Sequence, residues 1–154
     1  MKSYKKNSKS QYIVFWFRLS KYFTRNLSLK IIGIPVRLFY KLHVQWVLGV
    51  DIPDTTQIGK NLTIFHGQGL IVNSNTIIGD NVTLRHNTTI GNAKPNGGCP
   101  IIGNNVEVGA NSVIIGEISI GNNSIIAAGS VVVKDVPENV IVAGNPAKII
   151  KTLT

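Results

Sequence analysis

The sequence predicts an all-β solenoid, a stack of coils made of short parallel strands, with a short helical segment at its N-terminal end. Aliphatic residues return every six positions through the second half of the chain, and several are followed by Gly. This period fits neither the period of a helix nor the alternation of a single strand, so each unit must be a short strand plus a corner. The aliphatic positions are Ile78, Leu84, Ile90, Ile102, Val108, Ile114, Ile120, Ile126 and Val132.

Charge divides the chain into two parts. Residues 1–50 contain ten Lys or Arg and no Asp or Glu, whereas residues 51–154 contain six basic and seven acidic residues. The net charge of +9 is therefore the sum of +10 and −1, and all of it arises from the N-terminal third. Such a basic segment suits nucleic acid, an anionic membrane surface or a neighbouring subunit.

Residues 1–48 are predicted to be helical. Spacings of three and four residues predict an amphipathic helix whose apolar side holds Tyr12, Phe15, Trp16, Leu19, Tyr22 and Phe23. A second helix is predicted to begin near Pro35 and to bury Val36, Phe39, Tyr40, Leu42, His43, Trp46 and Val47. Basic residues interrupt both stretches, so we expect neither a membrane span nor a secretory signal.

The segment 1–48 is expected to cap the open end of the solenoid, because terminal coils need covering. Contact with an anionic membrane is a second interpretation, since basic and aromatic residues together suit the headgroup region. Nucleic acid is not expected as a partner, because the repeat offers no helix that could read a groove. The single Cys99 indicates a reducing compartment, so we expect a cytoplasmic protein, peripheral at the inner face of the membrane if the segment binds lipid.

The solenoid is predicted over residues 49–135, followed by a capping segment over residues 136–154. Regular coils only build the wall of a solenoid, so function is expected where the period fails. Two extra residues shift the phase between Ile64 and Val72, where a His lies beside flexible glycines. A second break at residues 92–100 has no aliphatic residue at repeat position 96 and is predicted to leave the wall as a loop.

His66, in the first break, is the candidate general base. A neutral imidazole can accept a proton from an attacking hydroxyl near neutral pH when a carboxylate holds its other nitrogen. Asp51 precedes it by fifteen residues, close to one coil of three units, so the two side chains can stack on one side of the prism. His86 occupies an outward position of a regular unit and is predicted to lie at the surface or at a trimer contact, with substrate contact as the alternative. His43 is predicted to pack within the second helix.

Four motifs, in this order, resemble those of the hexapeptide-repeat acyltransferases, and most closely the serine acetyltransferase branch and its capsule or exopolysaccharide acetyltransferase relatives. The resemblance covers residues 49–151. Its motifs are Gly49-Val50-Asp51-Ile52, His66-Gly67-Gln68-Gly69-Leu70-Ile71-Val72, Ala127-Ala128-Gly129-Ser130-Val131-Val132, and Val136-Pro137 with Ala143-Gly144-Asn145-Pro146-Ala147-Lys148.

The resemblance implies a left-handed parallel β-helix assembled as a homotrimer, with acetyl-CoA between adjacent prisms. It implies that His66 is the general base and that Asp51 orients it, while the acceptor hydroxyl attacks the thioester directly. The segment from Gly91 to Cys99 resembles a loop over the pantetheine arm. The other implied cofactor contacts are Ala110 and Ala128 along that arm and Lys148 near the CoA phosphates.

The chain departs from serine acetyltransferases at the candidate site. The residue before the catalytic His is usually acidic there, whereas this chain has Phe65, which would leave an acceptor ammonium without a countercharge and suits a sugar ring. The corresponding loop carries a second His, whereas this shorter loop reads Cys99-Pro100, and a nucleophilic role for this Cys is disfavoured. We therefore predict an acetyl-CoA-dependent O-acetyltransferase acting on a sugar or a cell-surface polysaccharide precursor.

Two alternatives stay open. The first is serine O-acetylation, with the large helical domain of those enzymes replaced by the basic segment. The second is a non-catalytic trimeric scaffold or a zinc-binding β-helix. No metal is expected, because a zinc site would need three converging His and only His66 and His86 lie in the solenoid.

Overall fold

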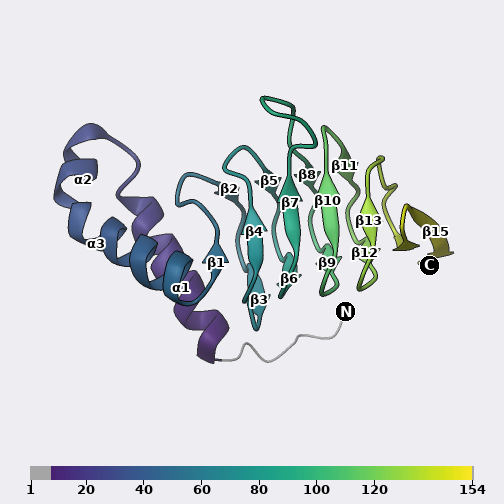
Figure 1. The fold of residues 1–154 in the computed structure, drawn as a ribbon, viewed down its shortest axis with the longest axis horizontal. Coiled ribbons are helices and arrows are strands. Elements are labelled where there is room, and N and C mark those ends of the chain that lie inside the picture. The colour runs from purple at the N-terminus through teal and green to yellow at the C-terminus, as the bar shows by residue number, and fades with distance from the viewer. Residues whose placement is uncertain (1–7, 154) are drawn as a thin grey trace.

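The computed structural model describes residues 8–153 as a three-sided prism of parallel β-strands with helices at one end (Figure 1). The predicted fold class is confirmed: this is a parallel β-solenoid preceded by a helical segment. Each coil contributes one strand to each of three sheets, here called sheets A, B and C.

The three sheets form the walls of the prism. Sheet A contains β1 (Val50–Asp51), β4 (Leu70–Val72), β7 (Thr89–Gly91), β10 (Val113–Ile115) and β13 (Val131–Val132). Sheet B contains β2 (Gln57–Ile58), β5 (Ile77–Ile78), β8 (Ile101–Ile102) and β11 (Ser119–Ile120). Sheet C contains β3 (Thr63–Phe65), β6 (Thr83–Arg85), β9 (Glu107–Val108), β12 (Ile125–Ile126), β14 (Val140–Gly144) and the antiparallel β15 (Ala147–Thr152).

The six-residue period places one aliphatic side chain of each strand inside the prism. All nine repeat positions predicted from the sequence are buried, and they stack on their equivalents in neighbouring coils. Asn residues with positive φ turn the corners, and along one edge their side chains are hydrogen-bonded from coil to coil. That ladder consists of Asn61, Asn81, Asn105, Asn123 and Asn139.

The strand register shows both breaks. Val50 pairs with Leu70, twenty residues on, whereas Ile71 pairs with Thr89, eighteen residues on, so the first coil holds two extra residues. Thr89 pairs with Val113, twenty-four residues on, so that coil holds six extra residues. Those six residues belong to the predicted loop at residues 92–100, which projects between β7 and β8 (Figure 1).

Helices cover the first coil. They are α1 (Ser8–Tyr22), α2 (Leu27–Ile32), α3 (Ile34–Phe39) with Pro35 in its first turn, and η1 (Tyr40–Val47), a π-helix. The hydrophobic core continues past Val50, the inward residue of β1, into the helices. Ile13 and Phe17 of α1, together with Tyr40 and Val44 of η1, belong to this core.

The predicted apolar sides of the helices were largely wrong. In α1 the buried side consists of Ser10, Ile13, Phe17 and Ser20, whereas Tyr12, Phe15 and Tyr22 are exposed. Small serines allow α1 to lie close to the coil, and the Ser10 hydroxyl accepts the backbone N–H of Ile64 at 3.0 Å. In η1, Trp46 and Val47 are exposed, because Tyr40 and Val44 face the solenoid instead.

Side chains from the helices satisfy the backbone carbonyls that the first coil leaves open. Arg18 donates to the carbonyls of Ile58 and Gly59, Lys21 donates to that of Thr56 at 2.7 Å, and Tyr40 donates to that of Ile52 at 2.6 Å. An uncovered sheet edge would expose these groups to pairing with another chain. Part of the basic character of the N-terminal segment therefore serves the cap.

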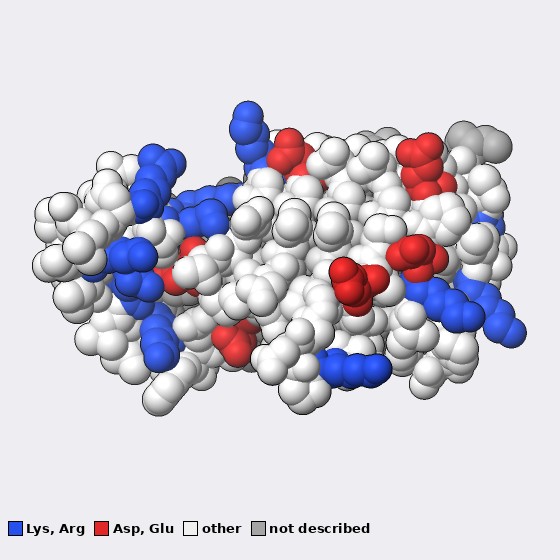
Figure 2. Space-filling view, turned by 90° about the horizontal axis from the view of Figure 1, so that it is seen from above, with Lys and Arg blue, Asp and Glu red and all other residues white. Residues whose placement is uncertain are grey.

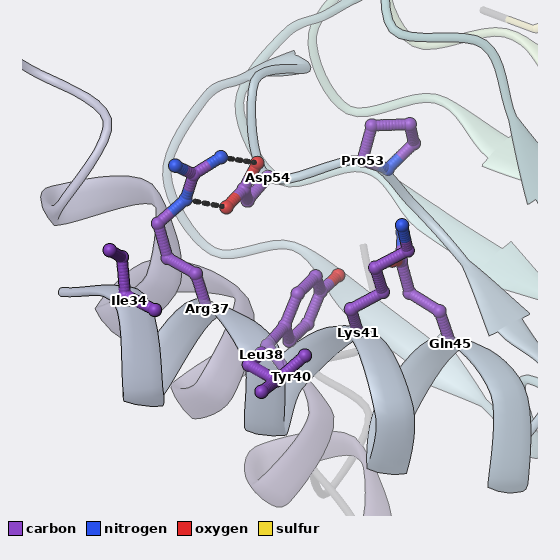
Figure 3. A pocket seen from close by; sticks show the side chains of 8 residues that line it. All are labelled: Ile34, Arg37, Leu38, Tyr40, Lys41, Gln45, Pro53 and Asp54. Atoms are coloured by element: carbon purple, nitrogen blue, oxygen red, sulfur yellow. Dashed lines mark hydrogen bonds and ion pairs between the residues drawn. The ribbon is translucent and has the colours of Figure 1, made fainter. Parts of the chain in front are cut away.

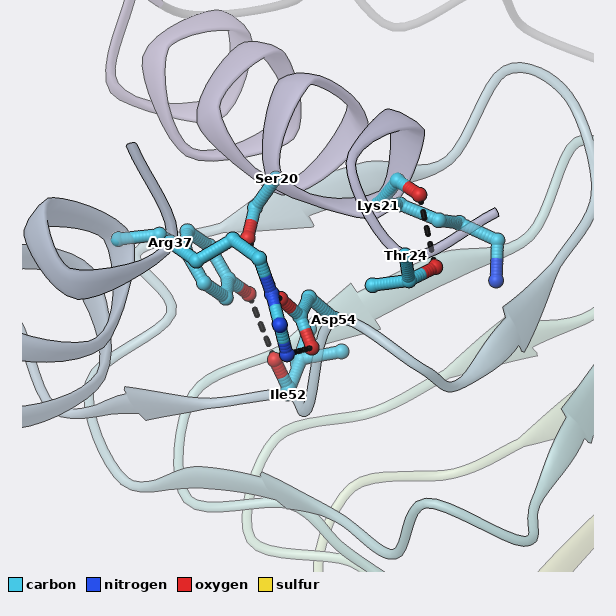
Figure 4. Close-up of polar contacts among 7 residues, drawn as sticks. Ser20, Lys21, Thr24, Arg37, Ile52 and Asp54 are labelled. Carbon is cyan, nitrogen blue, oxygen red and sulfur yellow. Dashed lines mark hydrogen bonds and ion pairs between the residues drawn. The ribbon is translucent and has the colours of Figure 1, made fainter. Parts of the chain in front are cut away.

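A carboxylate anchors the same contact. Asp54 accepts from Arg37 Nε at 2.8 Å and from the Ser20 hydroxyl at 2.7 Å (Figure 4). Burial alone would raise the pKa of Asp54, but the hydrogen bonds from Arg37 and Ser20 and the charges of Arg37 and Lys21 together hold it below its ordinary value. Burial lowers the pKa of Lys21, with repulsion from Arg18 as the next cause.

Candidate active site

The prism edge between sheets C and A, here called the His66 corner, collects most of the predicted site residues. Phe65 pairs with Arg85, so His66 and His86 are the next residues of two adjacent coils. The register of β6 on β9 and of β9 on β12 continues this column through Ala110 and Ala128. At the usual strand spacing, the column from His66 to Ala128 is about 14 Å long.

His66 has an unusual backbone. The N–H of Gly67 donates to the carbonyl of Phe65 at 2.9 Å, and His66, between them, has a φ of 66°. This is a γ-turn, a rare and strained conformation. Every other non-glycine residue with positive φ within residues 8–153 is Asn. The turn depends on glycine at position 67, which lies buried against the core. A Cβ atom there would lie only 3.1 Å from a side-chain carbon of Val50 and 3.0 Å from one of Ile64.

The two solenoid histidines lie together. The ring centroids of His66 and His86 are 5.6 Å apart, with the rings nearly perpendicular. His66 is exposed, while the Nδ1 atom of His86 is buried and has no hydrogen-bond partner among residues 8–153. The sequence held a signal for this pairing: counting the two inserted residues places His86 one coil after His66.

Asp51 lies near this turn but is not joined to it. It follows Val50, against which Gly67 packs, yet its carboxylate accepts from Gln45 Nε2 at 3.1 Å. Within residues 8–153, no hydrogen bond links Asp51 to His66. The predicted dyad would require the carboxylate to turn from Gln45 toward the imidazole, so the orienting role of Asp51 stays a prediction.

A shallow groove of about 330 Å³ continues along the column. Its lining includes Arg85 and Glu107 and the small residues Gly109, Ala110 and Ala128. Gly109 permits close stacking of the coils, because a Cβ atom there would lie 2.4 Å from the backbone nitrogen of Ala128. The small side chains keep this groove open along its floor, and the contact of Ala110 and Ala128 with the thioester arm stays a prediction.

Phe65 and Arg85 form one wall beside the histidines. The Arg85 guanidinium lies over the Phe65 ring, 5.1 Å from its centroid. This contact combines an aromatic face with a positive charge. Arg85 was not among the predicted site residues, although its position one coil after Phe65 could have indicated the pairing.

The remaining predicted residues lie elsewhere on the protomer. Gly91 ends β7 at the edge between sheets A and B, where the loop 92–100 begins, so it is not on the His66 corner. Lys148 lies on β15 and pairs with Ala143, at the end of sheet C that is distant from the helices. Cys99 is a partly buried free thiol.

A second cavity, of about 460 Å³, lies between the helices and the first coil (Figure 3). Gln45, which holds Asp51, lines it together with Lys41, Arg37 and Asp54. Sequence reasoning missed this cavity because it depends on how the helices pack. Within residues 8–153 no three His, Cys, Asp or Glu side chains are grouped to hold a metal ion. In the same part of the chain, no helix has the length and apolar character needed to cross a bilayer.

The chain and its fold are similar to known proteins. Residues 99–134 match the bacterial transferase hexapeptide family (six repeats). The chain is 41% identical over 126 residues to the colanic acid biosynthesis acetyltransferase WcaB of Escherichia coli (strain K12), covering 81% of this chain and 78% of that protein. The chain therefore belongs to the hexapeptide-repeat transferases, as the sequence motifs indicated.

Serine acetyltransferases are also similar. Serine acetyltransferase 4 of Arabidopsis thaliana is 42% identical over 109 residues, covering 70% of this chain and 31% of that protein. The structure of serine acetyltransferase in complex with coenzyme A from Brucella abortus strain S19 superposes with a TM-score of 0.81 at 33% identity. That match covers 95% of this chain but only 57% of the longer enzyme.

Proposed function

We propose that the protein transfers an acetyl group from acetyl-CoA to a hydroxyl group of a sugar, as part of a cell-surface polysaccharide or its precursor. Both groups of relatives are named acetyltransferases, and one solved relative was crystallised with coenzyme A, which supports an acetyl-CoA-dependent acyltransferase. The finer part of the proposal is the acceptor.

The wall formed by Phe65 and Arg85 is the observation that supports a sugar, rather than an amino acid, as the acceptor. An amino acid acceptor presents an ammonium group, which would meet an aromatic ring and a guanidinium here rather than a carboxylate. A sugar can set its hydroxyl groups against the Arg85 guanidinium and the histidines, and its apolar face beside the Phe65 ring. The 78% coverage of the polysaccharide-related relative supports the same acceptor class.

In the proposed reaction His66 removes the proton of the acceptor hydroxyl. The hydroxyl oxygen attacks the thioester carbonyl of acetyl-CoA, the C–S bond breaks, and the proton taken by His66 passes to the departing thiolate of CoA. His86, at the equivalent position one coil along, would hold the acceptor or the His66 ring. Ala110, Ala128 and Lys148 would contact CoA, and direct transfer in a fixed geometry needs no acyl-enzyme.

His66→Asn tests the base with little change of backbone, since Asn is the residue that tolerates positive φ best in this fold. We expect transfer to fall by about 10²–10⁴-fold, the usual contribution of a general base, with an unchanged melting temperature. His43→Asn is the histidine control and should keep its activity. Labelled acetyl transfer by the His66→Asn variant at the wild-type rate would contradict the role of His66.

The acceptor is tested separately with the wild-type protein. We expect acetylation of nucleotide-linked or lipid-linked sugars and little acetylation of free L-serine. Efficient acetylation of L-serine would instead identify the serine acetyltransferase activity named for the other relatives. Failure to bind coenzyme A would favour the scaffold alternative over both.

A further inference from the structure

The outer surface of the short helices carries a continuous set of exposed apolar side chains, here called the apolar row. In α3 and η1, Ile34, Leu38, Leu42 and Trp46 follow one another at intervals of four, which places them along one side of the helical run. Each is at least 44% exposed, and Trp46 is 71% exposed. The full row consists of Leu27, Ile31, Ile32, Ile34, Leu38, Phe39, Leu42, Trp46 and Val47.

A surface of this kind needs a partner. Proteins that stay alone in water rarely expose contiguous apolar patches of more than a few hundred Å². The packing of the helices explains why the row is outside: Tyr40 and Val44 fill the end of the prism, so the opposite side of η1 has nothing beneath it. The helices α2 and α3, which carry part of the row, lie at the end of the molecule in Figure 1.

The charges around the row are all of one sign within the helical segment. Arg18, Lys21 and Arg37 are bound to the first coil, but Arg25, Lys30 and Lys41 are exposed and form no ion pair within residues 8–153. Lys41 lines the same cavity as Ile34 and Leu38 (Figure 3). Viewed from above, many basic side chains gather at the helical end, others lie at the opposite end, and acidic ones are spread over the solenoid (Figure 2).

We propose that the apolar row docks on an anionic lipid surface. A second copy of the chain is disfavoured, because two rows meeting face to face would bring together two segments that contain ten basic residues and no acidic ones each. An anionic bilayer accepts both features: apolar side chains enter the boundary between headgroups and acyl chains, and Lys and Arg meet the headgroup charge. Trp46 has the amphipathic ring that favours this depth.

Docking would also orient the candidate site. The cavity beside the row reaches Gln45, whose amide holds Asp51 at the end of the solenoid nearest the histidines. A protein attached by the apolar row thus presents this end of the His66 corner toward the lipid surface. Substrates carried on lipid would meet the site there.

Vesicle flotation of the full chain tests the docking, without acceptor or acetyl-CoA, so the result is independent of the proposed reaction. The wild-type protein should float with vesicles of phosphatidylcholine and phosphatidylglycerol, float poorly with phosphatidylcholine alone, and be released by salt. The double variant Leu42→Ser with Trp46→Ser should lose binding by at least about tenfold. The matched control, Ile149→Ser with Ile150→Ser, removes two exposed apolar residues of β15 at the other end and should bind like the wild type.

Charge is tested in the same assay. Lys30→Glu with Lys41→Glu should weaken binding by at least about tenfold, whereas Lys134→Glu with Lys151→Glu should not. Brominated lipid should quench the fluorescence of Trp46 in the wild-type protein, a signal that Trp46→Ser removes while Trp16 remains. The proposal is overturned if the wild type stays unbound, if the row variant floats equally well, or if that variant instead changes the oligomeric state, which would assign the row to a second copy.

Discussion

At the scale of single residues, the cap depends on a few side chains that replace the missing coil of the solenoid. Tyr40 and Arg18 donate to carbonyls that would otherwise be paired by another strand, and Asp54 ties α1 and α3 to the loop after β1. Burial raises the pKa of Tyr40, which keeps its hydroxyl protonated as a donor throughout the ordinary pH range. These contacts are specific to the folded cap.

Asp54 gives the stability of the cap a defined pH dependence. Its pKa is lowered in the folded state, so the stabilisation is fully present above the ordinary Asp pKa of about 3.9 and is lost as the pH falls through the lower folded value. Asp54→Asn should therefore lower the melting temperature at pH 7, and the difference from the wild type should shrink below about pH 4. Glu138→Gln, at an exposed site, is the control. A difference that grows toward acid pH would contradict this assignment.

At the scale of secondary structure, the strands could be predicted from the sequence but the helical faces could not. A residue that points into the prism must be aliphatic in every coil, so the six-residue period alone predicts that Ile114 and Ile126 are buried. The face of α1 is chosen by the surface it meets, and there Ser10 and Ser20 fit closely while Phe15 stays outside. Helical spacing alone could not distinguish these sides.

The same distinction holds for the site. The sequence could propose His66 because it lies where the period breaks, and the alanines because they align with family motifs, and their roles stay predictions. The pairing of His86 with His66, the Arg85 contact with Phe65 and the bond between Gln45 and Asp51 depend on register and on helix packing. Each of these is a contact between separate segments, and the sequence pattern of neither segment predicts it.

The column of small residues on the His66 corner predicts a steric test. Ala128 is exposed and points away from the core, so Ala128→Leu should fold normally but obstruct the groove. We expect the KM for acetyl-CoA to rise by at least about tenfold, with a smaller effect on kcat. Ser119→Leu adds similar bulk at an exposed position of β11 in sheet B, outside this groove, and should leave the KM unchanged. An unaltered KM in Ala128→Leu would remove CoA from this groove.

At the scale of the whole molecule, the prism separates two parts of the predicted site. His66 lies at the edge between sheets C and A, whereas Gly91 and the loop 92–100 lie at the edge between sheets A and B. These edges border opposite sides of sheet A, so one protomer does not bring the loop over its own histidines. We infer that the site is completed in a homotrimer, where the loop of one protomer would face the His66 corner of the next.

Mixed trimers provide the test of this arrangement. A His66→Asn protomer keeps its loop, and a protomer that lacks residues 93–98 keeps its histidine, so each homotrimer should be inactive for a different reason. When the two are co-expressed with different tags and the mixed trimers are purified through both, one interface can combine an intact loop with an intact His66. Partial activity should return, and it should be absent when both changes are made in the same protomer and mixed with His66→Asn. Inactive mixed trimers, or a monomeric wild-type protein in sedimentation, would show that the loop and the histidine do not act across subunits.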